Sequence, residues 1–296
     1  WASLVARVIV VADGAIAADG PLNEVLAQQG DALRERGIWL PGDDVAAEVG
    51  PAPEVPPASS DATPIARVTD LTIGYDASAP VRSGIDLTIE RGVSTCIVGA
   101  NGAGKSTFAL TLAGLLPPLE GTVEVETSDG TAGDPHGWPS KRLLGRMSMV
   151  FQEPEYQFVR GTVREELQLG PRRLAALRRE PVDEGALAAA TESLAERLRL
   201  SGLLGANPFT LSGGEKRRLS VASALATAPR VLILDEPRVG QDAHTWGELV
   251  RIIRGLLAEG RAVLSITHDM EFTAALGGRS ITLDAPARDA QEGNRA

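Results

Sequence analysis

The sequence predicts an α/β fold with a central, mostly parallel sheet, an N-terminal antiparallel β layer and an inserted α-helical subdomain. Three observations predict it. Short, fully apolar runs such as Val231–Leu234 are typical of strands buried on both faces of a parallel sheet. These runs alternate with stretches of helical spacing, which is the order of an α/β core. Two earlier runs alternate apolar and polar residues, which indicates half-buried antiparallel strands.

The composition fits a globular protein of one or two domains. The chain has 296 residues, of which 43% are hydrophobic and 23% charged. Cys96 is the single cysteine, so a disulfide framework within the chain is excluded, and its apolar neighbours indicate a small buried side chain. No apolar run of the sequence approaches the roughly 18–20 residues that a membrane helix needs.

The negative charge is concentrated at the start of the chain. The net charge is −10, and the first 64 residues hold 10 acidic residues and three arginines. The rest of the chain is therefore nearly neutral. Because a nucleic-acid footprint needs a basic face or stripe, we expect no nucleic-acid partner.

Composition also divides the chain into regions. Residues 1–40 predict a strand over Val5–Val11, a turn at Asp13-Gly14, a second short strand and a helix over about 23–29. Residues 41–64 are Pro-rich and acidic, which is typical of a linker without a core. We expect the main domain over residues 65–288 and a short tail over residues 289–296.

The elements of the main domain follow in order. The antiparallel strands are predicted at Ile65–Ile73 and Val81–Ile89, the buried strands at Val93–Val98, Val231–Leu234 and Ala262–Thr267, and a helix from Gly104 to about Leu115. Residues 162–204 are rich in Leu, Ala, Arg and Glu at helical spacing, which predicts the inserted helical subdomain over about 155–210.

The segment from Gly99 to Thr107 reads G-x-x-x-x-G-K-[ST] between a buried strand and a helix, which predicts a P-loop NTPase. Glycines let main-chain N–H groups approach anionic oxygens, and the helix start adds further donors. Lys105 can reach the β- and γ-phosphates of ATP, and the Ser106 hydroxyl can bind Mg²⁺. The predicted phosphate-binding residues are Gly99, Asn101, Gly102, Ala103, Gly104, Lys105, Ser106 and Thr107.

Two acidic residues end the strand Val231–Leu234. A buried strand carries Asp235 to the carboxyl edge of the sheet, where ligands of α/β folds bind and where a carboxylate can hold Mg²⁺. Glu236 then faces the other way and can polarise an attacking water. By itself, the pair is equally typical of a solvated acidic turn.

A second small-residue segment, Leu211-Ser212-Gly213-Gly214-Glu215, precedes a helix. Free N–H groups and the positive helix end suit an anion. The same residues also suit a capped helix start with Ser212 and Glu215 as a capping box, and both interpretations can hold together.

This segment resembles the signature of the ATP-binding cassette family, and it lies 23 residues before Asp235, as in that family. Tyr75 resembles the aromatic residue that stacks on adenine, Gln152 the Q-loop glutamine, His268 the switch histidine and Asp242 the D-loop aspartate. The resemblance covers roughly residues 65–285. It implies ATP and Mg²⁺ as ligands. The implied catalytic residues are Lys105, Gln152, Glu236 and His268, and the implied metal ligands are Ser106, Gln152 and Asp235. The residues implied to act on the ATP of a second cassette are Ser212, Gly213, Gly214, Glu215 and Asp242.

One element departs from the family pattern. The D-loop has Arg238 in place of a small residue and Gln241 in place of an apolar one. This puts close communication across a cassette dimer in doubt at this loop. It does not affect Asp242 or the catalytic residues, so a binding-only site is not expected.

Residues 151–169 indicate a branch of the family. Gln157 and Thr162-Val163-Arg164-Glu165-Glu166 resemble the segment after the Q-loop in energy-coupling-factor ATPases, which power import of vitamins and metal ions. The resemblance implies a second cassette, a transmembrane coupling subunit and a substrate-binding membrane protein as partners, at the cytoplasmic face of the membrane. Tyr156 and Phe158 are candidates to face the coupling subunit, although they equally suit packing within the helical subdomain.

Residues 1–40 resemble the tail of a different cassette, through Val8–Gly14 and Glu24-Val25-Leu26. We therefore expect the natural protein to contain two fused cassettes, of which this chain holds the second and the end of the first. The start at Trp1, without an initiator Met, fits such a truncation.

Three other interpretations stay open. A soluble cassette ATPase acting on DNA or ribosomes is disfavoured, because only about 60 residues separate Gln152 from Ser212 and the predicted linker is acidic. An exporter or another importer cassette remains an alternative, as does a regulatory cassette without activity. Nothing in the sequence identifies the transported substrate.

Overall fold

The computed structural model describes residues 4–12, 14–43, 49–54, 64–127, 130–237 and 242–283. Its centre is a five-stranded sheet in the order β11-β5-β10-β9-β8, in which every neighbouring pair is parallel. These strands are β5 (Ser94–Val98), β8 (Met147–Val150), β9 (Val231–Asp235), β10 (Ala262–Ile266) and β11 (Gly278–Thr282).

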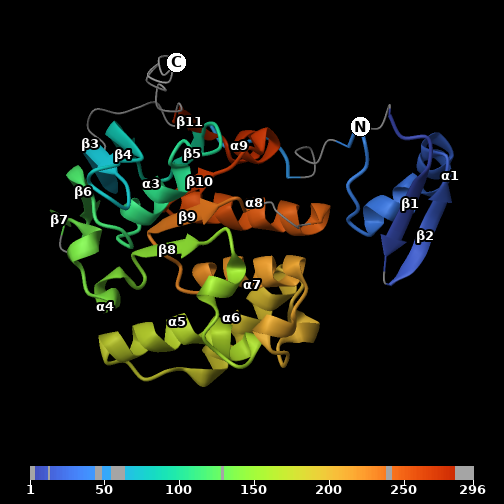
Figure 1. Cartoon of the computed structure of the whole chain (residues 1–296). Helices are drawn as coiled ribbons and strands as arrows, with labels where there is room; N and C mark the ends of the chain where they lie inside the picture. Colours follow the sequence, from blue (N-terminus) through green and yellow to red (C-terminus); the bar gives the residue numbers. More distant parts are fainter. Residues whose placement is uncertain are drawn as a thin grey trace, which may run out of the picture.

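Both faces of this sheet are covered, which explains the continuous apolar runs in its sequence. All residues of β9 and β10 are buried. Helix α3 (Lys105–Leu112) contacts β9 and β10, while α8 (Ala243–Ala258) contacts β10 and α9 (Met270–Leu276) (Figure 1). The parallel order brings the carboxyl ends of β5, β9 and β10 to one edge, where three of the sequence motifs lie.

The antiparallel layer has the order β4-β3-β6-β7. Its strands are β3 (Ala66–Ile73), β4 (Arg82–Ile89), β6 (Glu120–Glu126) and β7 (Ala132–Gly133), followed by the short helices η1 (Pro135–Gly137) and α4 (Ser140–Leu143). The inner residues of this layer pack around α3, whose Phe108 is fully buried. The layer therefore holds α3, the helix that follows the phosphate loop, against the parallel sheet.

The helical subdomain lies below the parallel sheet in Figure 1 and joins it through β8 and β9. Its elements are η2 (Pro154–Gln157), α5 (Val163–Arg178), α6 (Glu184–Arg197), η3 (Ser201–Leu203), η4 (Pro208–Thr210) and α7 (Gly213–Leu225). Helices α5 and α7 contact each other, and α7 also contacts η2 and β8. Helix α7 is thus the element through which the subdomain contacts the sheet.

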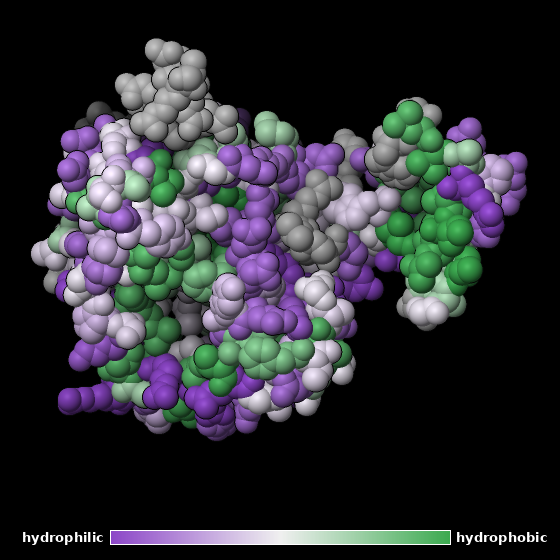
Figure 2. Space-filling model, in the orientation of Figure 1, coloured by the Kyte–Doolittle hydropathy of each residue, from purple (hydrophilic) through white to green (hydrophobic). Residues whose placement is uncertain are grey.

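The first 40 residues form a small separate unit. Strands β1 (Val8–Ala12) and β2 (Ala15–Gly20) make an antiparallel hairpin, and α1 (Leu22–Glu35) covers one face of it (Figure 1). The opposite face exposes Ile9, Val11 and Ile16, and Figure 2 shows a large apolar area on this unit. Helix α1 is longer than the sequence predicts.

The segment after α1 contacts the cassette at several points. The amide of Ala243 donates to the Gly37 carbonyl (2.9 Å), and the Trp39 ring packs edge-on against the buried Trp246 ring. Farther along, Arg254 donates to the carbonyl oxygens of Val49 and Gly50. Gly37, Trp39, Val49 and Gly50 therefore contact α8.

The fold class predicted from the sequence is confirmed, and the differences are local. Helix α3 ends at Leu112 rather than near Leu115, because Gly114 follows in a left-handed conformation (φ 75°). Cys96 is buried as expected, and burial raises the pKa of its thiol. Trp1, the D-loop residues Arg238 and Gln241 and the predicted tail 289–296 lie outside the described residues. Across the part of the chain that is described, no helix is both long and apolar enough to cross a membrane.

Candidate nucleotide-binding site

The phosphate loop connects β5 to α3 and presents almost no side chains. Gly104 caps α3 in a left-handed conformation (φ 89°), and a Cβ there would lie 2.9 Å from Val81 Cγ1. Gly102 is also left-handed (φ 82°) and faces open space. A loop of this shape leaves room for an anion to approach the main chain and the start of α3.

Lys105 is the first residue of α3 and lies under the loop. Its Nζ donates to the carbonyl oxygens of Gly99 (2.8 Å) and Ala100 (2.9 Å), and only 9% of the residue is exposed. The ammonium is therefore held at the site where the motif requires a positive charge against phosphate.

Ser106 and Asp235 meet from two different elements. Asp235 ends β9 and is 3% exposed. Burial raises the pKa of its carboxyl group, while a hydrogen bond from Ser106 and the charges of Arg217 and Lys105 act in the opposite direction. A hydroxyl oxygen beside a carboxylate oxygen is the kind of ligand pair that Mg²⁺ prefers.

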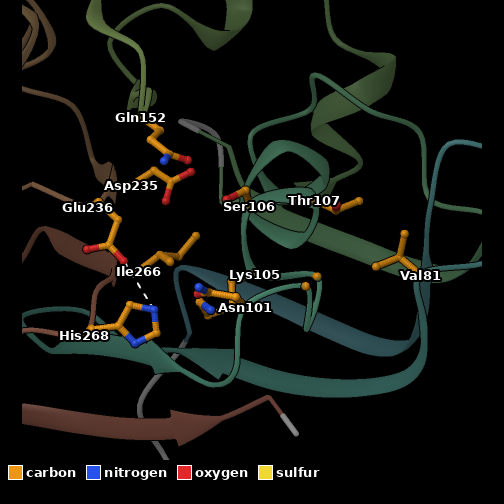
Figure 3. Close-up of a pocket in the computed structure, with 12 residues that line it drawn as sticks. Val81, Asn101, Lys105, Ser106, Thr107, Gln152, Asp235, Glu236, Ile266 and His268 are labelled. Atoms are coloured by element: carbon orange, nitrogen blue, oxygen red, sulfur yellow. Dashed lines mark ion pairs between the residues drawn. The ribbon is translucent and has the colours of Figure 1, made fainter. Parts of the chain in front are cut away.

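Glu236 lies one residue beyond the strand and faces the switch histidine. Its Oε1 is 3.7 Å from His268 Nε2, and the two side chains point toward each other in Figure 3. The backbone of Glu236 is left-handed (φ 49°), which is uncommon for a residue with a side chain, and its amide donates to the Ile266 carbonyl (2.8 Å). This turn directs the Glu236 side chain away from that of Asp235.

These side chains share one cavity of about 580 Å³ (Figure 3). Its lining comprises Val81, Asn101, Gly102, Gly104, Lys105, Ser106, Thr107, Gln152, Asp235, Glu236, Ile266 and His268. The four predicted catalytic residues and the three predicted metal ligands are all among them. Among the described residues, no cluster of three or more His, Cys, Asp or Glu suggests a different metal site.

A few predicted site residues lie elsewhere. Tyr75 is 71% exposed and does not line the cavity. Gly99 and the fully buried Ala103 belong to the phosphate loop but do not line the cavity either. Two lining residues, Val81 and Ile266, were missed by sequence reasoning. Both are apolar residues next to strand ends, a pattern that does not distinguish site from core.

The residues expected to act on a second cassette lie outside this cavity. Ser212 caps α7, with its side chain accepting from the Glu215 amide, and Glu215 accepts in return from the Ser212 amide (2.7 Å). Gly213 is exposed, and Gly214 is half-buried. Asp242 caps α8 and lies 3.4 Å from Arg199. The capping-box interpretation of Ser212 and Glu215 is confirmed.

The segment after Gln152 gives one correction. Tyr156 is 79% exposed, as a residue that faces a partner must be. Phe158 is buried and packs edge-on against Phe209, with ring centroids 6.0 Å apart. The prediction that Phe158 faces a coupling subunit is wrong, because the helical subdomain already covers its ring.

The comparisons with known proteins agree with this geometry. The family model described as "ABC transporter" matches residues 83–239, just over half of the chain. The energy-coupling factor transporter ATP-binding protein EcfA of Methanothermobacter thermautotrophicus is 36% identical over 73% of this chain and 67% of its own length. The cobalt import ATP-binding protein CbiO of Rhodobacter capsulatus is 36% identical over 73% of this chain and 74% of its own length.

A longer relative matches nearly the whole chain. The putative HMP/thiamine import ATP-binding protein YkoD of Bacillus subtilis is 32% identical over 96% of this chain, which spans only 52% of that protein.

Solved structures are also similar in fold. A dimeric bacterial ABC transporter cassette has a TM-score of 0.64 at 24% identity, covering 74% of this chain and 94% of that one, which bears on the fold alone. CbiO1 of Clostridium perfringens has a TM-score of 0.56 at 28% identity, covering 70% and 79%. These similarities show that the chain belongs to the ATP-binding cassette family of ATPases, in the branch that energises energy-coupling-factor transporters.

Proposed function

We propose that this chain binds Mg²⁺-ATP on the Gly99–Thr107 loop and hydrolyses it when a second cassette closes over the site, driving import of a vitamin or metal ion. The observation that carries the proposal is the single cavity that unites the loop lysine, the Asp235–Glu236 pair, Gln152 and His268. Phosphoryl transfer to water depends mainly on positioning and charge stabilisation, which such a cavity supplies.

The phosphate loop holds the triphosphate. Gly102 and Gly104 leave the main-chain N–H groups accessible, and Lys105 places its ammonium on the β- and γ-phosphates. Tyr75 stacks on the adenine from outside the cavity lining, where its exposed ring is free to meet the base.

Ser106, Gln152 and Asp235 hold the metal ion. Their hydroxyl, amide and carboxylate oxygens suit Mg²⁺, which prefers hard oxygen ligands. Bound there, the ion would neutralise negative charge on the phosphates. The charge of the ion would also stabilise the buried, ionised carboxylate of Asp235, which lacks the stabilisation that water gives to an exposed carboxylate.

Glu236 and His268 act on the water. Glu236 accepts the proton of the attacking water or orients it, and its side chain lines the same cavity as Lys105 and Asp235. His268, across from it at 3.7 Å, contacts the γ-phosphate and the same water.

The partner cassette completes the site. Exposed Ser212 and Gly213 at the start of α7, with Gly214 and Glu215, face the ATP of the other cassette, and Asp242 approaches from the start of α8. Arg238 and Gln241, whose unusual identities bear on this contact, lie outside the described residues.

The membrane partners contact the helical subdomain from the cytoplasmic side. Exposed Tyr156 and a groove lined in part by Gln157, Val159, Arg160 and Arg173 receive a coupling segment of a transmembrane subunit. A separate membrane protein binds the transported substrate. No nucleic acid takes part.

Residues 1–40 are the tail of a preceding cassette, and residues 41–64 connect it to this one. The match that spans 96% of this chain but 52% of the Bacillus subtilis relative supports two cassettes in one polypeptide. The idea fails if the upstream coding DNA contains no second phosphate loop in frame.

The role of Glu236 is tested by Glu236→Gln. We expect ATP turnover to fall about 100-fold or more, because general-base catalysis contributes about 10²–10⁴-fold, while ATP binding measured by calorimetry stays close to that of the wild type. Glu259→Gln, at the end of α8 and outside the cavity lining, is the matched control and should retain full turnover. Undiminished turnover of Glu236→Gln would exclude Glu236 as the base.

A further inference from the structure

Helix α7 carries a buried arginine that reaches into the catalytic loops. Arg217 is 2% exposed. Its Nη1 donates to the carbonyl oxygens of Phe151 and Gln152, and its Nη2 donates to those of Asp235 and Glu236. One guanidinium thus holds the backbone of two separate loops, both of which contribute side chains to the ATP site.

Only arginine can make this connection. Its planar fork offers several donors in fixed directions, whereas lysine presents one compact ammonium. The hydrogen-bond partners of Arg217 among the described residues are all neutral main-chain carbonyls. Burial lowers the pKa of its guanidinium, while the nearby carboxylates of Asp235, Glu236 and Glu153 act in the opposite direction. The Nε of Arg217 is buried without a hydrogen-bond partner, so the buried charge depends on the four carbonyl contacts of its two Nη atoms. The geometry of the two loops and the position of Arg217 therefore constrain each other.

Glu236 is the residue most dependent on this contact. Its left-handed backbone (φ 49°) is a conformation that persists only where the surroundings hold it. On one side, its amide donates to Ile266 in the sheet. On the other, its carbonyl accepts from Arg217. Removing Arg217 would remove one of these two main-chain hydrogen bonds, which hold the turn on opposite sides.

We propose that Arg217 is a positioning residue that makes the orientation of Glu236, and the path of the Gln152 loop, depend on where α7 lies. Helix α7 begins at the Ser212 cap, the part of the chain assigned above to the ATP of the second cassette. Contact of α7 with the partner's nucleotide is therefore transmitted, through one side chain, to this chain's own catalytic carboxylate. The inference rests on the proposed role of Glu236.

Arg254 offers a matched control. Among the described residues, it also donates to main-chain carbonyls, those of Val49, Gly50 and Ala275. It lies on α8 and does not line the cavity. Replacing either arginine by glutamine removes a guanidinium that joins separate segments. Only the Arg217 change disturbs the catalytic loops.

The experiment compares Arg217→Gln, Arg217→Lys and Arg254→Gln by thermal unfolding, ATP affinity and kcat. For both Arg217 variants we expect kcat to fall roughly 100-fold, as for a misplacement of about 1 Å at the reacting groups, with ATP affinity within about threefold of the wild type. Arg254→Gln should lose thermal stability and keep its kcat. Arg217→Lys, the milder change, carries the test if Arg217→Gln does not fold.

The outcomes separate this inference from the proposed function. If the Arg217 variants only lose stability, as Arg254→Gln does, Arg217 is a structural clamp and the inference is overturned. If Glu236→Gln keeps its turnover, the assignment of Glu236 fails first. If both assignments hold, adding Arg217→Gln to Glu236→Gln causes little further loss, because the two changes then act on the same group.

Discussion

Single residues of the phosphate site were predictable because their motif is contiguous. Lys105, Ser106 and Thr107 follow the loop glycines directly, so spacing alone places them at the start of a helix. Residues that reach the site through the tertiary fold were not. Lys216, Arg217 and Arg218 read as a run of surface charge, yet Arg217 is buried and bonded to two loops. Lys216 and Arg218 are half-buried, and no local signal in the sequence marks Arg217 as the fully buried member of the run.

At this scale, Lys105→Met tests the charge on the loop. The change removes a donor that now contacts Gly99 and Ala100, and a charged hydrogen bond contributes about 1.5–3 kcal/mol. ATP affinity should therefore fall about 10- to 100-fold in calorimetric titration. Lys141→Met, at an exposed position on α4, serves as the control and should bind ATP normally. Equal affinity of the two variants would contradict the assignment.

Elements were predictable where their burial leaves a strong pattern. The fully buried strands β9 and β10 and the helix after the phosphate loop were expected close to where they lie. Strand β6 was missed because it reads Glu-Gly-Thr-Val-Glu-Val-Glu, a charged sequence whose valines alone face the core. Strand β8 was missed because it has only four residues. Short or charged strands depend on neighbours that the local sequence does not reveal.

At the scale of elements, the capping box of α7 predicts a pH dependence. Hydrogen bonds from the Ser212 hydroxyl and amide lower the pKa of Glu215 below its usual value of 4.5. Because the folded-state pKa is lower than the unfolded one, the stabilisation is present above that usual value and is lost as the pH falls through the lowered pKa. The wild type should therefore unfold at a higher temperature than Glu215→Gln at neutral pH.

The two proteins should converge as the pH is lowered below about 4.5. Ser212→Ala, which removes the cap itself, should lower stability by about 1 kcal/mol at neutral pH. A difference between wild type and Glu215→Gln that is the same at every pH would show that the charge on Glu215 does not contribute.

At the scale of the whole molecule, composition predicts an N-terminal unit apart from the cassette but does not reveal the contacts between them. The contacts join residues about 200 positions apart, such as Glu35 and His244, whose Nε2 lies 3.0 Å from the Glu35 carbonyl. A hairpin and one helix are too small to be stable alone, and the buried cluster among the described residues of this unit consists of Ala18, Val25 and Leu33. Its stability must therefore come largely from docking on α8.

Trp39→Ala tests this dependence. Trp39 packs on Trp246, whose Nε1 donates to Asp269 (3.3 Å), so the contact joins the N-terminal unit to the residue after His268. For a half-buried tryptophan we expect a loss of about 1–3 kcal/mol in urea unfolding, less than the 3–5 kcal/mol typical of a fully buried one. Trp39→Phe should recover most of it, because an aromatic ring restores the edge-on contact.

The control is Ile16→Ala, at an exposed position on the free face of the hairpin, which should change stability by less than about 0.5 kcal/mol. Protease cleavage within residues 37–54 should also become faster in Trp39→Ala, since the segment is no longer held on α8. If Trp39→Ala and Ile16→Ala were equally stable and equally resistant, the N-terminal unit would have to be stable without α8, and the contacts at Gly37 and Trp39 would be incidental to the fold.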